Sequence, residues 1–143
     1  MIAVRIGPDW RFSVVASPAY FERHAAPDTP QDLTDHICIN QRLKSAGGLY
    51  AWEFEKDGRE LKVRVEGQLT FNSAVPILTA AIDGLGVAFV PEDLARPFIR
   101  EGRLIEVLAE WCPMIQGYHL YYPHRRQNSP AFALLVEALR YRQ

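Results

Sequence analysis

The fold is decided mainly by residues 68–93, QLTFNSAVPILTAAIDGLGVAFVPED. A short apolar strand ends before Asn72 and Ser73, and these two residues predict a helix start because they lead the ranking of N-terminal caps. The apolar residues that follow recur at helical spacing, and Gly84 fits the left-handed position that ends a helix. Residues 87–90 then form a continuous apolar run, which is typical of a buried parallel strand. The stretch predicts strand, helix, strand and the start of another helix.

The flanking sequence extends this alternation in both directions. Expected strands are residues 2–6, 12–16, 36–40, 50–55, 61–65, 103–107 and 117–122. Further helices are expected to begin at Ser17-Pro18, Thr29-Pro30 and Ser129-Pro130, where a capping residue precedes a proline at the first helical position. Asp57-Gly58 predicts a tight hairpin turn. The class is therefore α/β, a mixed sheet flanked by helices with an antiparallel hairpin inserted.

Composition excludes several classes of function. The chain has 143 residues, which is one domain, and no apolar run approaches the length needed to span a bilayer. The net charge of −1 argues against a nucleic-acid-binding domain, and the basic pairs Arg125-Arg126 and Arg140/Arg142 are too small to change this. Two cysteines make no disulfide framework and the start resembles no signal peptide, so a cytoplasmic location is expected.

Motifs for catalysis, cofactors and metals are missing from the sequence. No phosphate-binding loop or nucleophile elbow occurs, and Gly84-Leu-Gly86 follows a helix, the reverse of a dinucleotide site. The four histidines have no metal-ligand spacing. Cys38 is expected to be a core residue, whereas Cys112 is open to being exposed and oxidisable. We therefore predict no enzyme activity, no cofactor, no catalytic residue and no metal site.

One local feature favours ligand binding. At residues 71–73 a strand ends where a helix begins, and the free N–H groups and positive dipole of a helix N-terminus attract anions. The alternative interpretation is that Asn72 or Ser73 only caps its own helix.

Taken in order, nine stretches resemble the effector-binding domain of LysR-type transcriptional regulators. They are residues 3–7 (AVRIG), 15–21 (VASPAYF), 29–33 (TPQDL), 36–39 (HICI), 52–54 (WEF), 67–73 (GQLTFNS), 80–91 (AAIDGLGVAFVP), 120–123 (LYYP) and 129–132 (SPAF). No single block is specific, but the ordered set covers the chain from end to end.

The resemblance implies a type II periplasmic-binding-protein-like fold, in which two crossing strands join two α/β lobes. This chain begins at the first crossing strand, so the DNA-binding winged helix-turn-helix, the linker helix and most of the first lobe are expected to be absent. Residues 1–10 would be the first crossover strand and 11–113 the second lobe. Residues 114–143 would be the return strand and terminal helix that normally pack on the first lobe.

The resemblance also implies a site. In the family, a small molecule, often an organic acid, binds between the lobes and changes how a tetramer sits on DNA. The second-lobe wall would comprise Asn40, Arg42, Phe71, Asn72, Ser73 and Ala74, and the hinge Arg5, Ile6, Gly7 and Tyr122. Arg42 would pair with a carboxylate because guanidinium groups match carboxylates, unless it is an ordinary surface arginine.

Three alternatives stay open: a solute-binding protein fragment of the same fold, an α/β enzyme domain, and an interaction module without a ligand. The terminal helix carries an apolar face made of Phe132, Leu135, Val136 and Leu139. We expect this face to pack onto a partner chain, or the termini to exchange between protomers, because a large apolar patch in water is unfavourable. The chain alone is expected to bind effector weakly or not at all, since one wall cannot enclose a ligand.

Overall fold

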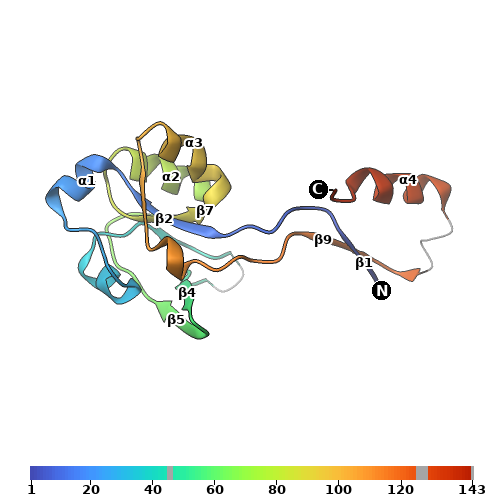
Figure 1. Cartoon of the computed structure of the whole chain (residues 1–143), viewed down its shortest axis with the longest axis horizontal. Coiled ribbons are helices and arrows are strands. Elements are labelled where there is room, and N and C mark those ends of the chain that lie inside the picture. The colour runs from blue at the N-terminus through green and yellow to red at the C-terminus, as the bar shows by residue number, and fades with distance from the viewer. Residues whose placement is uncertain (45–46, 125–128, 143) are drawn as a thin grey trace. The chain divides into compact units, whose positions relative to one another are not determined.

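The computed structural model describes residues 1–44, 47–124 and 129–142. Part of the turn expected at residues 45–48 and the Arg125-Arg126 pair lie outside these residues. The chain forms two compact units (Figure 1). The central unit is Arg11–Pro113, and the terminal unit combines Met1–Trp10 with Met114–Gln143.

A three-stranded sheet in the order β7-β2-β8 lies at the heart of the central unit. It consists of β2 (Phe12–Ala16), β7 (Ala88–Pro91) and β8 (Ile105–Val107), and both neighbours run antiparallel to β2. The prediction of a parallel strand at residues 87–90 is therefore wrong for its main pairing. A continuous apolar run reports burial on both faces and not strand direction, and residues 87–90 are indeed buried.

Helices cover one face of this sheet and a hairpin lies on the other (Figure 1). On the helical side, α2 (Ala74–Ile82) and α3 (Glu92–Arg100) pack with Val15 and Ile39 in one apolar core. On the other side, Val14 and Phe89 pack with Trp52 of the hairpin in a second core. Burial of aliphatic and aromatic side chains on both faces holds these layers together.

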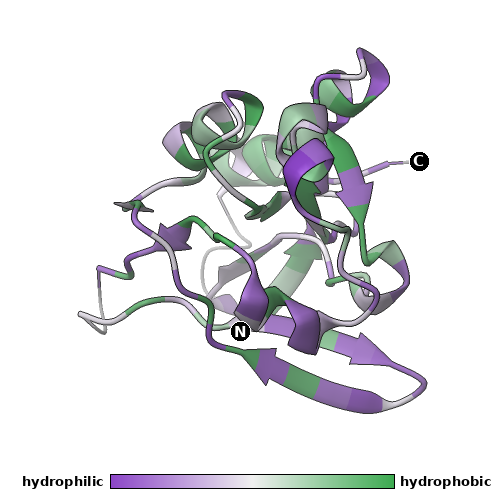
Figure 2. Cartoon of the chain, turned by 90° about the vertical axis from the view of Figure 1, so that its left-hand side faces the viewer, coloured by the Kyte–Doolittle hydropathy of each residue, from purple (hydrophilic) through white to green (hydrophobic). Residues whose placement is uncertain are grey.

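The hairpin joins β4 (Trp52–Lys56) to β5 (Arg59–Val63), with Trp52 opposite Val63. Its turn residues Asp57 and Gly58 have φ values of 52° and 79°, so the predicted tight turn is confirmed. Hydrophilic and hydrophobic residues alternate along both strands (Figure 2). Trp52 and Phe54 are consequently buried while Glu53 faces solvent.

The strand expected at residues 36–40 is shorter in the structure. Only β3 (Asn40–Gln41) forms there, and it pairs in parallel with β6 (Thr70–Phe71). Cys38 makes a single parallel bridge to Val87 just before it. The backbone of this segment divides its hydrogen bonds between two neighbours, because the Cys38 N–H donates to the Glu66 carbonyl at 2.9 Å and the Ile39 N–H donates to the Val87 carbonyl at 2.9 Å.

The predicted helix starts are confirmed. Ser17 caps α1 (Pro18–Arg23) by accepting the Tyr20 N–H at 3.1 Å. Thr29 and Asp32 form a capping box at the start of η1 (Pro30–Asp35), which is a 3-10 helix. A second 3-10 turn, η2, covers Ala109–Trp111.

Helix α2 stops where the sequence indicates. Gly84 follows it with a φ of +82°, the left-handed conformation that glycine adopts without strain. The Gly84-Leu85-Gly86 stretch is thus a helix stop and a tight entry into β7.

The terminal unit is a two-stranded ribbon with one helix. β1 (Ile2–Arg5) pairs antiparallel with β9 (His119–Tyr122). Ser129 caps α4 (Pro130–Leu139), and the Tyr141 N–H donates to the Arg5 carbonyl at 2.8 Å. Within the described residues, no helix combines the length and apolar character needed to cross a membrane.

Candidate functional site

The carboxyl ends of β3 and β6 bring most of the expected site residues together. The two strands are parallel, and the Arg42 N–H donates to the Phe71 carbonyl at 2.8 Å. Arg42 therefore lies beside Phe71 and the start of α2. Ends of adjacent parallel strands are where α/β sheets bind ligands.

The start of α2 is open to solvent. Ser73 holds the N-cap position with φ −150° and ψ 162°, but its side chain makes no capping hydrogen bond. Asn72 and Ser73 are both exposed, whereas Phe71 and Ala74 are half-buried. The capping interpretation is thus right about position only, and the Ser73 hydroxyl is available to a ligand at the positive end of the helix dipole.

Arg42 is exposed at the rim of this region. Its side chain approaches the Gly47 carbonyl at 3.5 Å, a long hydrogen bond that restrains it little. The guanidinium can therefore turn toward an anion at the α2 N-terminus.

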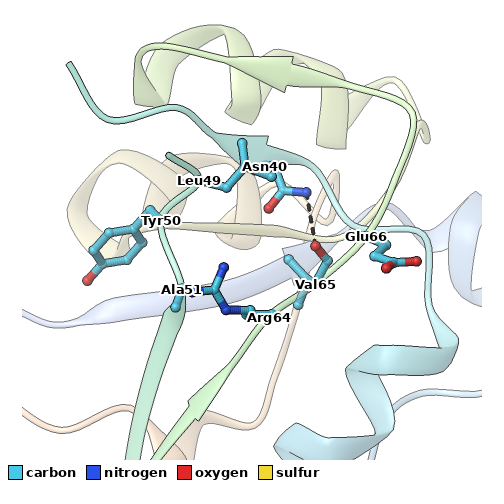
Figure 3. Close-up of a pocket in the computed structure, with 7 residues that line it drawn as sticks. All are labelled: Asn40, Leu49, Tyr50, Ala51, Arg64, Val65 and Glu66. Atoms are coloured by element: carbon cyan, nitrogen blue, oxygen red, sulfur yellow. Dashed lines mark hydrogen bonds between the residues drawn. The ribbon is translucent and has the colours of Figure 1, made fainter. Parts of the chain in front are cut away.

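Asn40 lies apart from the other predicted residues. Its side chain is 4% exposed and donates from Nδ2 to the Val65 carbonyl at 3.0 Å. It lines a pocket of about 190 Å³, together with Tyr50 and Arg64 (Figure 3). Its lining comes from β3, from residues 49–51 before the hairpin and from residues 64–66 after it.

Sequence reasoning missed Tyr50 and Arg64. The alternation of residues 61–65 indicated that Arg64 lies on the wet face of a strand, and it is exposed. The sequence signal that was available is Asn40, a polar residue directly after the apolar run Ile37–Ile39, because a buried amide needs polar partners nearby.

The hinge residues divide into two places. Arg5 binds the Gly7 carbonyl through Nε at 2.9 Å and Asp9 through Nη2 at 3.2 Å. The Ile6 N–H donates to the Tyr118 carbonyl at 2.9 Å, and buried Gly7 packs beside the same residue. Tyr122 instead pairs with Ile2 at the far end of the ribbon. Arg5, Ile6 and Gly7 thus form one group, and Tyr122 does not join it.

Both cysteines are buried, which corrects the expectation that Cys112 is open to solvent. Cys112 is 7% exposed because the η2 turn folds it into the core, where its thiol lies 3.5 Å from the Leu108 carbonyl. Burial raises the pKa of the Cys38 and Cys112 thiols to about 12. Neither is a nucleophile at neutral pH. Among the described residues, no three His, Cys, Asp or Glu side chains form a metal-binding group.

The fold defines a mixed α/β domain, and comparison with known proteins identifies its family. The family model of the LysR substrate binding domain matches residues 1–143. The chain therefore belongs to the LysR substrate-binding domain family.

Two curated relatives match nearly the whole chain. A putative transcriptional regulator of Pseudomonas aeruginosa is 58% identical over 141 residues, which cover 99% of this chain and 46% of that protein. The HTH-type transcriptional regulator PgrR of Escherichia coli is 46% identical over 142 residues, covering 99% of this chain and 48% of that protein. The chain thus spans about half the length of these relatives.

A solved structure agrees on the fold. The regulatory domain of the C227S variant of AphB from Vibrio vulnificus superposes with a TM-score of 0.79 at 25% identity, covering 96% of this chain and 68% of that one. The expected type II periplasmic-binding-protein-like fold is confirmed. These relatives are transcriptional regulators, which excludes the alternative of an α/β enzyme domain.

Proposed function

We propose that the central unit is the ligand-sensing wall of a LysR-type transcriptional regulator. A small acidic effector binds at the cleft that this wall forms with a first lobe, and a winged helix-turn-helix elsewhere in the parent protein binds DNA. The supporting observation is the open start of α2 beside Arg42, at the ends of two parallel strands, in a chain of this family.

The chemistry of that wall favours an anion. The helix N-terminus carries a partial positive charge, and the Arg42 guanidinium can meet a carboxylate with two parallel hydrogen bonds. Together they favour an organic acid over a neutral or cationic ligand.

Signal transmission follows from hinge closure. Residues 1–10 and 114–122 are the crossing strands, and Arg5, Ile6 and Gly7 form the hinge. A ligand that prefers one lobe arrangement shifts the population toward it, and the parent oligomer then binds DNA differently. A cytoplasmic location follows from this role.

The terminal helix supplies an association surface. Within α4, Val136 is buried and Phe132 packs on Tyr122, but Leu134, Leu135 and Leu139 are 74%, 51% and 41% exposed. We propose that a first lobe covers this face in the parent protein. In the isolated chain, a second copy covers it.

Charge reversal at the start of α2 tests the proposed site. In the parent-length regulator, Ser73→Asp should weaken the calorimetric affinity for small carboxylates about tenfold or more, since like charges repel in the cleft. The helix itself should stay intact because aspartate is a good N-cap.

The matched control is Thr79→Asp, which adds the same charge to an exposed position of the same helix. It should leave carboxylate affinity nearly unchanged. Equal affinities in the wild type and in Ser73→Asp would contradict the proposal.

A further inference from the structure

We propose that the pocket between β3 and the hairpin is a binding site for a small 2-amino or 2-hydroxy carboxylate, held by Arg64 and Asn40. This inference rests on the proposed function, because it locates an acid-recognising site within the same sensing unit. It places a second carboxylate site at Arg64, separate from the proposed site at Arg42 and the start of α2.

The orientation of the Asn40 amide is determined by its surroundings. The Nδ2 group donates to the Val65 carbonyl at 3.0 Å, and a carbonyl can only accept. Nδ2 must therefore face Val65, and the amide oxygen turns toward the Arg64 side of the pocket (Figure 3). No hydrogen bond to this oxygen occurs among the described residues, and it is not one of their buried unpaired polar atoms, so it is accessible from the pocket and can accept a hydrogen bond from a ligand.

Arg64 supplies the charge. Its guanidinium extends below Asn40 toward Ala51, on the same side of the pocket as the amide oxygen (Figure 3). Among the described residues it has no ion pair, in contrast to Arg11, which is bound to Glu106 at 2.6 Å. An arginine without an acidic partner at a pocket wall suits a carboxylate ligand.

The other end of the pocket restricts the ligand further. Glu66 carries its carboxylate on the side of Val65 away from Arg64 (Figure 3). This separation lets an anion reach Arg64 and favours a cationic donor, such as an ammonium group, over a neutral one. The volume of about 190 Å³ lies below that of ordinary drug-sized sites, so the ligand or the ligand fragment is small.

The test is a nuclear magnetic resonance titration of the 15N-labelled chain with four probes of similar size. L-alanine and L-lactate carry both a carboxylate and a donor, propanoate lacks the donor, and L-alaninamide lacks the carboxylate. We expect L-alanine and L-lactate to shift the Asn40 side-chain amide and the Tyr50 and Val65 backbone signals, with dissociation constants of the order of 1 mM. Propanoate should bind more weakly, and L-alaninamide should leave these signals unchanged.

Two variants test the role of Arg64. Arg64→Gln should weaken L-alanine binding about tenfold or more, the scale of losing one charge-assisted pair. Lys62→Gln removes the same charge from an exposed strand residue outside the pocket and should preserve the affinity.

Unchanged binding by Arg64→Gln, equal binding of propanoate and L-alanine, or no shift at Asn40 with any probe would each overturn the inference. Carboxylate-induced shifts confined to Arg42 and residues 71–74 would overturn it while supporting the proposed function. If the wild-type parent-length regulator bound no small carboxylate, that result would instead count against the proposed function.

Discussion

At the scale of single residues, we expect a polar cluster of Tyr20, His24 and His36 beside α1 to make stability depend on pH. Buried Tyr20 accepts the Ile37 N–H at 3.1 Å and contacts Nδ1 of His36 at 2.7 Å. When Nδ1 of His36 carries no proton, it can accept the Tyr20 hydroxyl hydrogen, and this bond favours the neutral ring. The His24 ring stacks on Tyr20 with centroids 4.4 Å apart.

Stability should therefore fall in mild acid. Burial lowers the pKa of His36 and nearby His24 lowers it further, while Asp32 and Asp35 act in the opposite direction. Between this lowered pKa and the unfolded value of about 6.5, the unfolded chain binds more protons, so the free energy of unfolding decreases as pH drops. Urea unfolding at a series of pH values measures this slope.

His36→Gln should flatten the slope, whereas removal of the exposed His124 by His124→Gln should leave it intact. A slope that is identical in the wild type and in His36→Gln would refute the role of this cluster.

Residue-scale features were the most predictable from sequence. Capping pairs such as Ser17-Pro18 and the Asp57-Gly58 turn depend only on neighbours along the chain, so they can be recognised from the local sequence. The roles of Asn40 and Arg64 depend on segments brought together by folding, and the sequence revealed only that Asn40 follows an apolar run. The burial of Cys112 also depends on a turn that sequence alone indicated only as a loop.

At the scale of elements, the path of residues 64–67 after β5 is held against the segment that precedes β3. The Cys38 N–H donates to the Glu66 carbonyl at 2.9 Å. At Gly67 the backbones approach so closely that a Cβ would lie 1.8 Å from the Cys38 carbonyl oxygen. This contact keeps Val65 and Asn40 in register.

Gly67→Ala should accordingly lower the free energy of unfolding by about 2 kcal/mol or more, because the added Cβ would clash with backbone atoms of Cys38, which cannot rotate away as a flexible side chain could. Gln68→Ala, at the exposed next position, should change it by less than about 0.5 kcal/mol. Chemical denaturation of the two variants decides this, and an unaffected Gly67→Ala protein would contradict the close approach.

Strand pairing was the element-scale property that sequence could not supply. The apolar run at residues 87–90 indicated burial correctly, but β7 pairs antiparallel with β2. Strand direction depends on which distant segment lies alongside, and hydrophobic pattern does not encode it. For the same reason, only β3 forms where a strand was expected at residues 36–40.

At the scale of the whole molecule, the terminal unit leaves large apolar side chains exposed, because its two-stranded ribbon and single helix are too small to bury them. Such a ribbon is marginal in water unless further surface packs on it. The exposed leucines of α4 are continuous along the helix, which favours association.

The isolated chain should therefore self-associate through α4. Sedimentation of the wild type should show a dimer that dissociates on dilution, and Leu135→Glu should shift the population to monomer. Val75→Glu introduces the same charge at an exposed apolar position of α2 and should leave the dimer in place. A wild-type monomer with a protease-sensitive α4 would refute the prediction that the chain associates through this helix.

The central claim, that this chain senses an acid on behalf of a DNA-binding regulator, is tested most directly by operator binding. The assay measures the affinity of the parent-length regulator for its own promoter, with and without a small carboxylate that binds it calorimetrically. We predict that the carboxylate changes this affinity in the wild type and in Thr79→Asp, and that Ser73→Asp abolishes the change. A response that persists in full in Ser73→Asp, or DNA affinity that no bound carboxylate alters, would contradict the account.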